Sequence, residues 1–493
     1  MQTKEVQVIG GGLAGSEAAW QLAERGYRVV LHEMRGVRGT PAHQTDRLAE
    51  LVCSNTFKST EVTNAHGLLK AEMRLLGSMV LQAADEARVP GGSALTVDRE
   101  RFAAAVHERI ASHPRITLVR EEVAALPRVG IVATGPLTSP ALTAAIQARL
   151  GVESLAFYDA IAPIVAGDSI DMDIAFRASR WGKETMQGAG DEGAYLNCPF
   201  TREQYEAFLD ALTAADQYEG KEFDPIPYFE GCMPVEEMAK RGRESLRFGP
   251  MKPIGLRDPR SGAKPWAVAQ LRMEDAAGRM WNIVGFQTRM RTGEQAKVLR
   301  MIPGLQHAEF LRWGSIHRTS YINSAAALTS WLSLRDAPTT MFAGQLTGVE
   351  GYTESTATGI LAALNLARQL EGEEPALPPP TTMLGALYRY LRDADPRHFQ
   401  PMNANFGLLD ELPVKVKDKI EKRVQYAERA LAVMGEWKSM LSRAGSGDGV
   451  PPTELRTDTL RQGHSVPAPP THSTNAEPGS PPAGMPGEDH VRS

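Results

Sequence analysis

The sequence predicts an α/β fold in which a domain built on a βαβ unit is interrupted by an inserted α+β domain. A strand-like run at residues 6–9 leads into a glycine-rich turn, and a second strand, glycine-rich loop and helix return at residues 340–368. Between them, residues 136–333 change in character, with many aromatic, Met, Pro and scattered basic residues. The nucleotide-binding pattern of the first segment does not recur there, so we expect an inserted substrate domain.

The opening turn reads G-x-G-x-x-G, and each of its glycines has a physical role. Gly10 permits a tight turn after the strand, Gly12 has no Cβ to hold the backbone away from a pyrophosphate, and Gly15 lets the next helix pack on the sheet. The N-terminus of that helix then faces the phosphates. The predicted cofactor contacts are Gly10, Gly11, Gly12, Leu13, Ala14 and Gly15.

The residues after this turn complete a Rossmann-like βαβ unit. A helix is predicted over residues 17–25 and a second strand over residues 27–33. Glu33 ends that strand 18 residues after Gly15 (33 − 15), near the offset at which an acidic side chain accepts a hydrogen bond from a ribose hydroxyl. Glycine-rich turns without a ligand are common, but this context favours a nucleotide site, with FAD, NAD and S-adenosylmethionine all compatible at this point.

A later strand also ends in small residues. A helix is predicted over residues 98–113, a strand over 116–120 and a further strand over 129–135 that ends in Ala133, Thr134 and Gly135. Small residues let the backbone approach a ligand closely, and flavoproteins of the two-dinucleotide type bring the chain past FAD at this place. A simple strand and turn is the alternative.

The segment from residue 340 repeats the pattern of strand, loop and helix. The loop contains Gly344, Gln345, Gly348 and Gly351, and a helix is predicted over residues 353–368. Its N-terminus could face the cofactor or simply be capped. An enzyme that uses S-adenosylmethionine needs neither this loop nor the strand end at residues 133–135, so FAD is favoured.

Composition narrows the class of protein. The chain has 493 residues, 42% of them hydrophobic and 23% charged, which suits two or three soluble domains. No run approaches the ~18 apolar residues of a membrane span, and no export signal is predicted. Three cysteines without a C-x-x-C pair indicate neither disulfides nor zinc, and a reducing cytoplasm is expected. Residues 445–493, rich in Gly, Pro and Ser, predict a disordered tail.

Two cysteines lie in polar segments that are typical of functional loops. Cys53 lies within residues 51–59 and Cys232 within residues 228–237, whereas Cys198 has neutral neighbours and is expected to be structural. An isolated cysteine is usually a small buried hydrophobic residue. Basic residues near the first two, such as Lys58, could stabilise a thiolate.

These segments resemble the folate- and FAD-dependent tRNA (uracil-5-)-methyltransferase family. The resemblance covers about residues 4–440, and Thr56 and Thr353 depart from the family pattern, where serine and valine are common. The quoted segments are residues 10–15, 51–59, 196–199, 229–236 and 344–355. The fold implied is an FAD-binding Rossmann-like domain of the two-dinucleotide type, formed by residues 1–135 and 334–444, with an inserted tRNA-binding and substrate domain at residues 136–333.

The resemblance implies C5 methylation of the T-loop uridine of tRNA to 5-methyluridine. In this family 5,10-methylenetetrahydrofolate donates the carbon, reduced FAD is carrier and reductant, and NADH or NADPH supplies electrons. Because uracil C5 is a poor nucleophile, a thiolate must first add to C6. By resemblance Cys232 is that nucleophile, and Cys53 lies near the flavin, where it protects the cofactor that carries the carbon or assists in removing the C5 proton. No obligatory protein partner and no membrane are expected.

Recognition of tRNA would explain two basic segments of the chain, which could contact its phosphates. The net charge of −5 argues against a generally basic protein, but residues 240–264 hold eight basic residues against two acidic ones, and residues 412–443 form a second basic, helical pattern. The target uridine must leave its loop stack to be modified. We predict tRNA contacts by Lys240, Arg241, Arg243 and Arg247. A solvated surface is the alternative for each segment.

Three other functions remain open. A related flavoprotein family that modifies the wobble uridine of tRNA shares the fold and the folate donor, but its chains are longer. A general NAD(P)H-dependent flavin oxidoreductase would be expected to carry a second nucleotide fingerprint, and none is visible. A flavin-bearing RNA-binding protein without turnover would leave the two cysteine loops unexplained.

Overall fold

The centre of the nucleotide-binding region is a sheet of five parallel strands. The computed structural model describes residues 5–40, 42–151, 155–183, 186, 193–218 and 233–444. The strands of this sheet follow in the order β16, β7, β1, β2, β6. Their bounds are β1 (Glu5–Ile9), β2 (Arg28–Glu33), β6 (Ile116–Arg120), β7 (Gly130–Val132) and β16 (Thr340–Phe342). In the middle of the sheet Val8 pairs with Leu31 on one side and Ile131 on the other, and all three are fully buried.

Two helices pack closely on this sheet and on each other. They are α1 (Leu13–Glu24) and α11 (Tyr352–Leu370). A Cβ on Gly359 would lie 2.3 Å from the Ala14 carbonyl oxygen, so only a glycine allows this approach. Helix α1 begins at Leu13, four residues before the predicted start, because Gly12 serves as its N-cap. The glycine-rich turn and the first helical turn are therefore one structure.

The parallel sheet joins parts of the chain that are far apart in sequence. Met341 of β16 pairs with Ile131 of β7, so the chain returns to the same sheet after the middle region. This return is what an interrupted domain requires. Leu142 of α5 (Pro140–Leu150) and Ile322 pack in the core of this sheet although they lie inside the predicted insertion. The exact domain boundaries stay a prediction.

The middle of the chain forms a second, mainly antiparallel sheet with its own core. Its strand order is β10, β11, β12, β13, β9, β14. The bounds are β9 (Ile164–Ala166), β10 (Phe176–Arg177), β11 (Tyr195–Phe200), β12 (Ala267–Met273), β13 (Met280–Ile283) and β14 (Phe310–Arg312). The accompanying helices are α6 (Arg202–Ala214), α7 (Val235–Lys240), α8 (Ser245–Phe248) and α9 (Thr292–Leu299). Cys198 is fully buried in this core, and burial raises the pKa of its thiol to about 12, which suits a structural residue.

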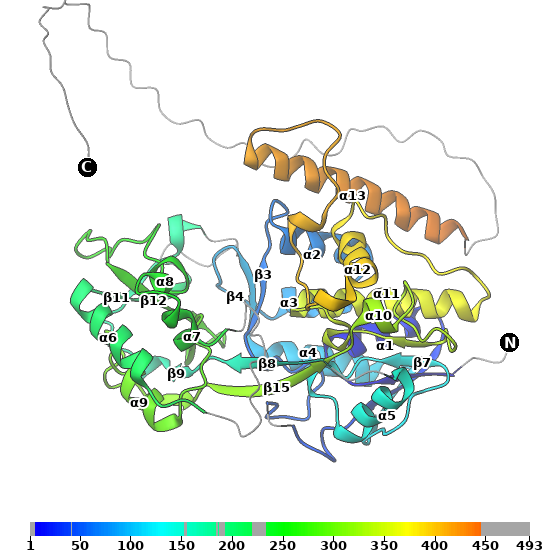
Figure 1. The fold of residues 1–493 in the computed structure, drawn as a ribbon, viewed down its shortest axis with the longest axis horizontal. Helices are drawn as coiled ribbons and strands as arrows, with labels where there is room; N and C mark the ends of the chain where they lie inside the picture. Colours follow the sequence, from blue (N-terminus) through cyan, green and yellow to red (C-terminus); the bar gives the residue numbers. More distant parts are fainter. Residues whose placement is uncertain are drawn as a thin grey trace, which may run out of the picture. The chain divides into compact units, whose positions relative to one another are not determined.

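Smaller sheets and further helices complete the described part of the chain. The antiparallel pair β8 (Leu155–Ile161) and β15 (Ser315–Tyr321) precedes and follows the second sheet along the chain and runs between the two groups of elements in Figure 1. The other small sheet contains β3 (Thr56–Ser59), β4 (Arg88–Val89) and β5 (Ala94–Val97). The remaining helices are α2 (Ala65–Leu75), α3 (Met79–Glu86), α4 (Arg99–Ser112), α10 (Ser324–Ala327), α12 (Met383–Asp393) and α13 (Lys419–Ala444).

Several sequence-based boundaries agree with these elements, and others shift. The predicted strand at residues 116–120 coincides with β6, and the predicted helix at 98–113 is α4. The strand expected over residues 129–135 ends at Val132, after which a short 3-10 turn begins at Gly135. In the basic segment at residues 412–443 the helix begins only at Lys419. The tail prediction for residues 445–493 lies outside the described residues.

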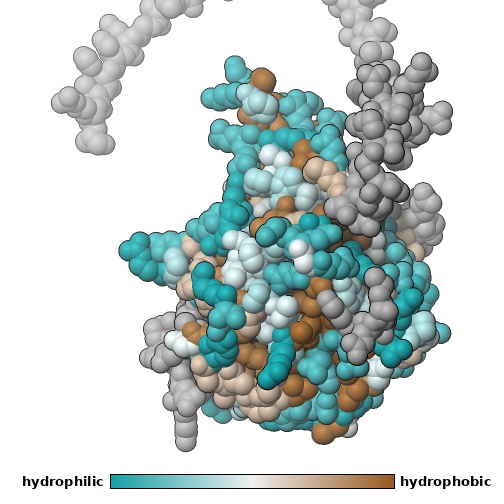
Figure 2. Space-filling view, turned by 90° about the vertical axis from the view of Figure 1, so that its right-hand side faces the viewer, coloured by the Kyte–Doolittle hydropathy of each residue, from teal (hydrophilic) through white to brown (hydrophobic). Residues whose placement is uncertain are grey.

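The described helices do not include a membrane-spanning segment: none of them is both long and apolar enough to cross a bilayer. Figure 2 shows one face of the molecule, on which hydrophobic residues are interspersed with hydrophilic ones.

The first prediction separates the structural glycine of the turn from the ligand-facing one. A Cβ on Gly15 would lie 1.8 Å from the Gly10 carbonyl oxygen, whereas a Cβ on Gly12 meets no atom within 4 Å. We therefore expect Gly15→Ala to destabilise the protein by about 1–3 kcal/mol through overpacking. Gly12→Ala, the matched control, should unfold at the wild-type temperature when all three proteins are compared without bound nucleotide, which would add its own stabilisation. Thermal unfolding of the two variants tests this, and equal melting temperatures would contradict it.

Candidate functional site

A large pocket opens at the carboxyl ends of the parallel strands. Its walls come from the residues that follow β1, β2, β7 and β16, which is where open α/β sheets bind their ligands. Its empty volume is about 1070 Å³, including its open side.

Most of the predicted cofactor contacts line this pocket. They are Gly10, Gly12, Leu13, Ala14, Glu33, Ala133, Thr134, Gly135, Gly344 and Gln345. Gly11, Gly15, Gly348 and Gly351 are not among its lining residues. Gly348 instead has a positive φ of 85° and lies so close to Phe399 that a Cβ would come within 2.6 Å of the ring. Its part in the site is to shape the loop.

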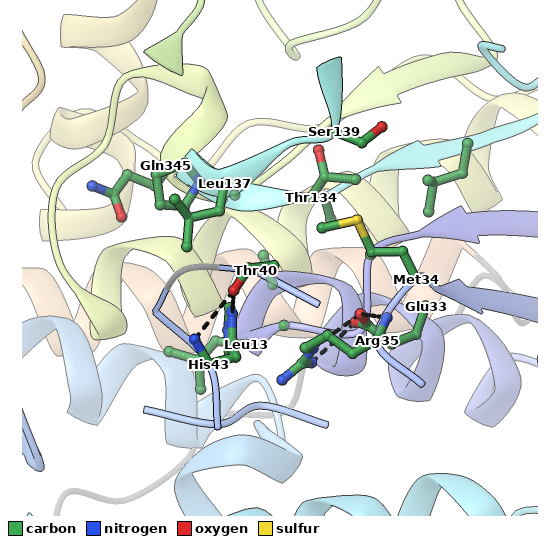
Figure 3. A pocket seen from close by; sticks show the side chains of 18 of the residues that line it. Leu13, Glu33, Met34, Arg35, Thr40, His43, Thr134, Leu137, Ser139 and Gln345 are labelled. Carbon is green, nitrogen blue, oxygen red and sulfur yellow. Dashed lines mark hydrogen bonds and ion pairs between the residues drawn. The ribbon is translucent and has the colours of Figure 1, made fainter. Parts of the chain in front are cut away.

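Glu33 is held at the end of β2 by four hydrogen bonds. Its Oε2 accepts the Gly11 N–H at 2.8 Å, and its Oε1 accepts the Arg35 backbone N–H at 2.9 Å. The Arg35 guanidinium donates from Nε to Oε1 and from Nη2 to Oε2, both at 3.0 Å (Figure 3). Burial raises the pKa of this carboxyl, but the bonds and charge of Arg35 outweigh it and keep the pKa below its usual range. Glu33 is therefore an anionic acceptor in the pocket wall, and the bond from a ribose hydroxyl stays a prediction.

The loop after Glu33 adds pocket residues that the sequence reasoning missed. Arg35, Thr40 and His43 line the cavity, and Thr40 Oγ1 lies 2.6 Å from His43 Nδ1 (Figure 3). Burial, followed by the charge of Arg35, lowers the pKa of His43 to about 4, so its imidazole is neutral. The signal available was the position of Arg35, which follows Glu33 by only two residues, in the turn after β2.

Cys53 lies at the same pocket, against a tyrosine from the start of α11. The Tyr352 hydroxyl oxygen accepts the N–H groups of Cys53 at 3.0 Å and of Ser54 at 3.1 Å, and it lies 3.2 Å from Cys53 Sγ. Burial raises the pKa of Tyr352 well above its ordinary value, so the phenol stays protonated. Because its oxygen already accepts two bonds, its hydrogen is available to donate to the sulfur.

Two guanidinium groups hold the chain just before Cys53. Arg99 Nη1 donates to the Leu51 carbonyl at 2.6 Å, and Arg312 Nη1 donates to the Val52 carbonyl at 3.3 Å. Arg99 also forms an ion pair with Glu274, which is 1% exposed and follows β12 of the second sheet. The thiol therefore lies on a loop that both sheets position.

A buried polar cluster lies directly behind this loop. Glu354 follows Tyr352 by two residues and accepts His66 Nδ1 at 3.0 Å and the Ala404 N–H at 2.9 Å. The fully buried Lys70 donates to the carbonyls of Phe57 and His66, both at 2.8 Å. Burial is the main cause that lowers the pKa of Lys70 to about 7. This cluster anchors α2 to the Cys53 loop and to the start of α11.

The structure describes the predicted RNA contacts but not the second cysteine. Cys232 lies outside the described residues. Lys240 Nζ pairs with Glu237 at 2.8 Å and Arg243 with Asp210 at 2.7 Å, and Arg241 follows the last residue of α7. Arg247, on α8, lies apart from the nucleotide pocket. The four basic residues thus lie on α7, on α8 and between these two helices.

Comparison with known proteins gives close relatives over nearly the whole chain. A family model described as Glucose inhibited division protein A matches residues 5–374. A Geobacter sulfurreducens protein named methylenetetrahydrofolate--tRNA-(uracil-5-)-methyltransferase TrmFO is 56% identical over 437 residues, covering 88% of this chain and 99% of that protein. A Bacillus subtilis protein of the same name is 51% identical, with 87% and 98% covered.

A solved structure agrees with the fold. Aquifex aeolicus GidA, in its form I crystal, superposes with a TM-score of 0.61 at 16% identity, covering 90% of this chain and 78% of that one. At this identity the likeness concerns the fold alone. It confirms the prediction of an α/β flavoprotein-like architecture with an interrupted Rossmann-like domain.

The second prediction concerns acid stability. Burial raises the pKa of Glu354, but the bond from His66 and the charge of Lys58 more than offset it, and the pKa falls from 4.5 to about 2. A depressed carboxyl stabilises the fold above its unfolded pKa and loses that contribution as the pH falls toward the folded value. At 1.36 kcal/mol per pKa unit, the contribution is about 3 kcal/mol.

We expect wild type to exceed Glu354→Gln in unfolding free energy at pH 7, and the difference to shrink between pH 4.5 and about 2. Urea unfolding at several pH values measures it. Glu374→Gln, which alters an exposed acid just after the same helix, is the matched control and should show no such trend. A difference that is constant or grows as the pH falls would refute the assignment.

Proposed function

The chain belongs to the family of methylenetetrahydrofolate--tRNA-(uracil-5-)-methyltransferases, and on this premise we propose that it methylates C5 of the T-loop uridine of tRNA, forming 5-methyluridine. The observation that carries the proposal is the 56% identity to a relative of that name, of which the chain covers 99%. Methylenetetrahydrofolate is the proposed carbon donor. The relatives' names favour this activity over wobble-uridine modification and over a general flavin oxidoreductase.

The pocket residues fit FAD. The space beside Gly12 is open to 4 Å, as a backbone that must approach a pyrophosphate requires, and the pocket continues past the anionic Glu33 on one side and to Cys53 on the other. The first turn of α1 begins at this point, with its N–H groups available to phosphate oxygens. When bound here, reduced FAD would carry the one-carbon unit from the folate and supply the electrons that make it a methyl group.

The source of those electrons and the compartment are part of the same proposal. NADH or NADPH is the proposed reductant. The sequence contains one G-x-G-x-x-G turn, so the reductant would have to reach the flavin without a second dinucleotide domain of its own. The reducing cytoplasm expected from the cysteine content suits this chemistry.

Two cysteines would act on the uracil ring. The Cys232 thiolate adds to C6, so that an Sγ–C6 bond forms and electron density moves to C5. C5 then bonds to the incoming carbon and loses its proton, and the bond from that carbon to its carrier breaks. A hydride equivalent from the proposed reductant would complete the methyl group as the Sγ–C6 bond breaks and the thiolate is restored. The position of Cys53 in the pocket wall supports its assignment to the cofactor side, where it would take the C5 proton or shield the carbon-carrying cofactor.

The tRNA must bring one extruded uridine to these groups. Lys240, Arg241, Arg243 and Arg247 are the proposed phosphate contacts. Three of them already form ion pairs with carboxylates: Lys240 with Glu237, Arg243 with Asp210, and Arg247 with Glu244 at 2.7 Å. Phosphate binding would therefore compete with these exposed ion pairs, which individually contribute little.

The third prediction tests the activity directly. Purified protein should show a flavin absorbance band and, with NAD(P)H, methylenetetrahydrofolate carrying a labelled carbon and unmodified tRNA, should form labelled 5-methyluridine in the T loop by mass spectrometry of the RNA. A tRNA with cytidine in place of the target uridine is the control and should remain unlabelled. A protein that stays colourless with added FAD, or modification at another position, would overturn the proposal.

The fourth prediction tests the nucleophile. Wild type should form a covalent complex with a tRNA minihelix containing 5-fluorouracil, because fluorine at C5 cannot leave as a proton does and the Sγ–C6 adduct persists. Cys232→Ala should form none, and Cys198→Ala, which alters the buried structural cysteine, should form it as wild type does. Denaturing gel electrophoresis measures the complex. Its persistence in Cys232→Ala would show that the assignment is wrong.

A further inference from the structure

A second hollow lies on the antiparallel sheet, away from the nucleotide pocket. It is formed where β11 ends and α6 begins, with α8 and the loop before β12 as its other walls. Its lining residues include Phe200, Thr201, Arg247, Lys264 and Trp266. None of them lines the nucleotide pocket, and none is a cysteine. Neither the proposed cofactor site nor the two cysteines account for this hollow.

A stacked arginine and tryptophan form the rigid part of the hollow. The guanidinium carbon of Arg247 lies 3.7 Å from the centre of the Trp266 ring. Arg247 Nε donates to the Trp266 carbonyl at 2.8 Å, and Nη1 donates to Glu244 at 2.7 Å. Arg202, from the start of α6, adds a second guanidinium 5.3 Å from the same ring. The conformational entropy of Arg247 is therefore already lost before a ligand binds.

Arg247 and Arg202 pair with Glu244 and Glu206, at 2.7 and 2.9 Å, but the hollow keeps one cation and one guanidinium N–H group that no carboxylate of the described residues takes up. Lys264 is exposed and, among the described residues, pairs with no carboxylate. Asp258 is the acidic residue in the lining, and Arg260 already binds both of its oxygens, at 3.0 and 2.9 Å. Arg247 Nη2 has no acceptor within the described part of the chain. A phosphate could take a bond from Nη2 and pair with Lys264 without displacing an existing partner.

We propose that this hollow binds a nucleotide of the tRNA other than the reacting uridine. Lys264 and Arg247 hold its phosphate, and its base stacks against the planar groups of the Arg202, Arg247 and Trp266 cluster. Cations combined with aromatic and guanidinium planes are the means by which proteins bind unpaired nucleotides. An acidic peptide would bind the cationic groups but would not use the flat faces of the tryptophan ring and the guanidinium groups, on which a base can stack. The proposal rests on the proposed tRNA substrate and assigns a second anchoring point for it.

The test compares variants of the full-length protein in binding to the tRNA minihelix and to whole tRNA. Lys264→Glu should weaken binding about fivefold or more. It should also reduce the slope of log affinity against log salt concentration by about 1, the contribution of one phosphate contact. Lys297→Glu, the matched control, reverses an exposed charge on α9 of the same sheet region and should bind within about twofold of wild type. Trp266→Leu should weaken binding about tenfold, whereas Trp266→Phe retains an aromatic plane and should stay within about threefold.

Two further measurements make each outcome decisive. The melting temperature and the flavin content verify that each variant folds. If Trp266→Leu does not fold, the binding of Lys264→Glu and Trp266→Phe still tests the proposal. Photocrosslinking of a tRNA that contains 5-bromouridine should label the peptide with Trp266. If wild type methylates tRNA while Lys264→Glu and Lys297→Glu bind equally well, the second anchoring point is wrong and the proposed function stands. If wild type neither binds nor methylates tRNA, the proposed function itself fails.

Discussion

The site depends on one set of buried hydrogen bonds that fixes the Cys53 loop between the two sheets. Asn55 is fully buried and donates to the carbonyls of Val97 and Met273, both at 2.8 Å, while its Oδ1 accepts from Arg272 at 2.7 Å. Leaving any of these groups unpaired would cost about 1–3 kcal/mol, more for the charged one. The ion pair of Arg99 and Glu274 makes a second bond across the same junction. Motion of either sheet therefore disturbs the loop that carries the thiol.

The parallel sheet supplies the other half of the geometry. Its strands end at one edge, so the glycine turn, Glu33, residues 133–135 and Gly344 meet there although they are separated by more than three hundred positions in the chain. The same edge receives Tyr352 from the first turn of α11. A dinucleotide lying along this edge would place one end beside Glu33 and the other beside Cys53. The pocket at this edge and the position of the Cys53 sulfur are thus consequences of a single strand arrangement.

Charge is distributed differently in the two halves of the molecule. Around the Cys53 loop the charged groups are buried and compensated: Glu354 by His66, Glu33 by Arg35, and Arg99 by Glu274. On the antiparallel sheet the arginines and lysines are mostly exposed, in ion pairs that solvent weakens. The first arrangement holds the Cys53 loop and the pocket wall at fixed positions, because breaking a buried pair is costly. The second leaves charge available to a polyanion, which suits a large substrate that binds and leaves.

The sequence by itself determined the βαβ unit, the glycine turn, Glu33, the return of the chain at β16 and the family, because these are local patterns of glycine and hydrophobic residues with fixed spacing. It did not determine that α1 starts at Leu13, that Arg35 and His43 line the pocket, or that Tyr352 meets Cys53 from 299 residues away. Nor did it show that Arg243 is paired with Asp210, or that Lys264 lines a hollow on the antiparallel sheet. Only the tertiary structure decided these points, since a hydrogen bond or an ion pair depends on which distant side chains the packing brings within about 3 Å.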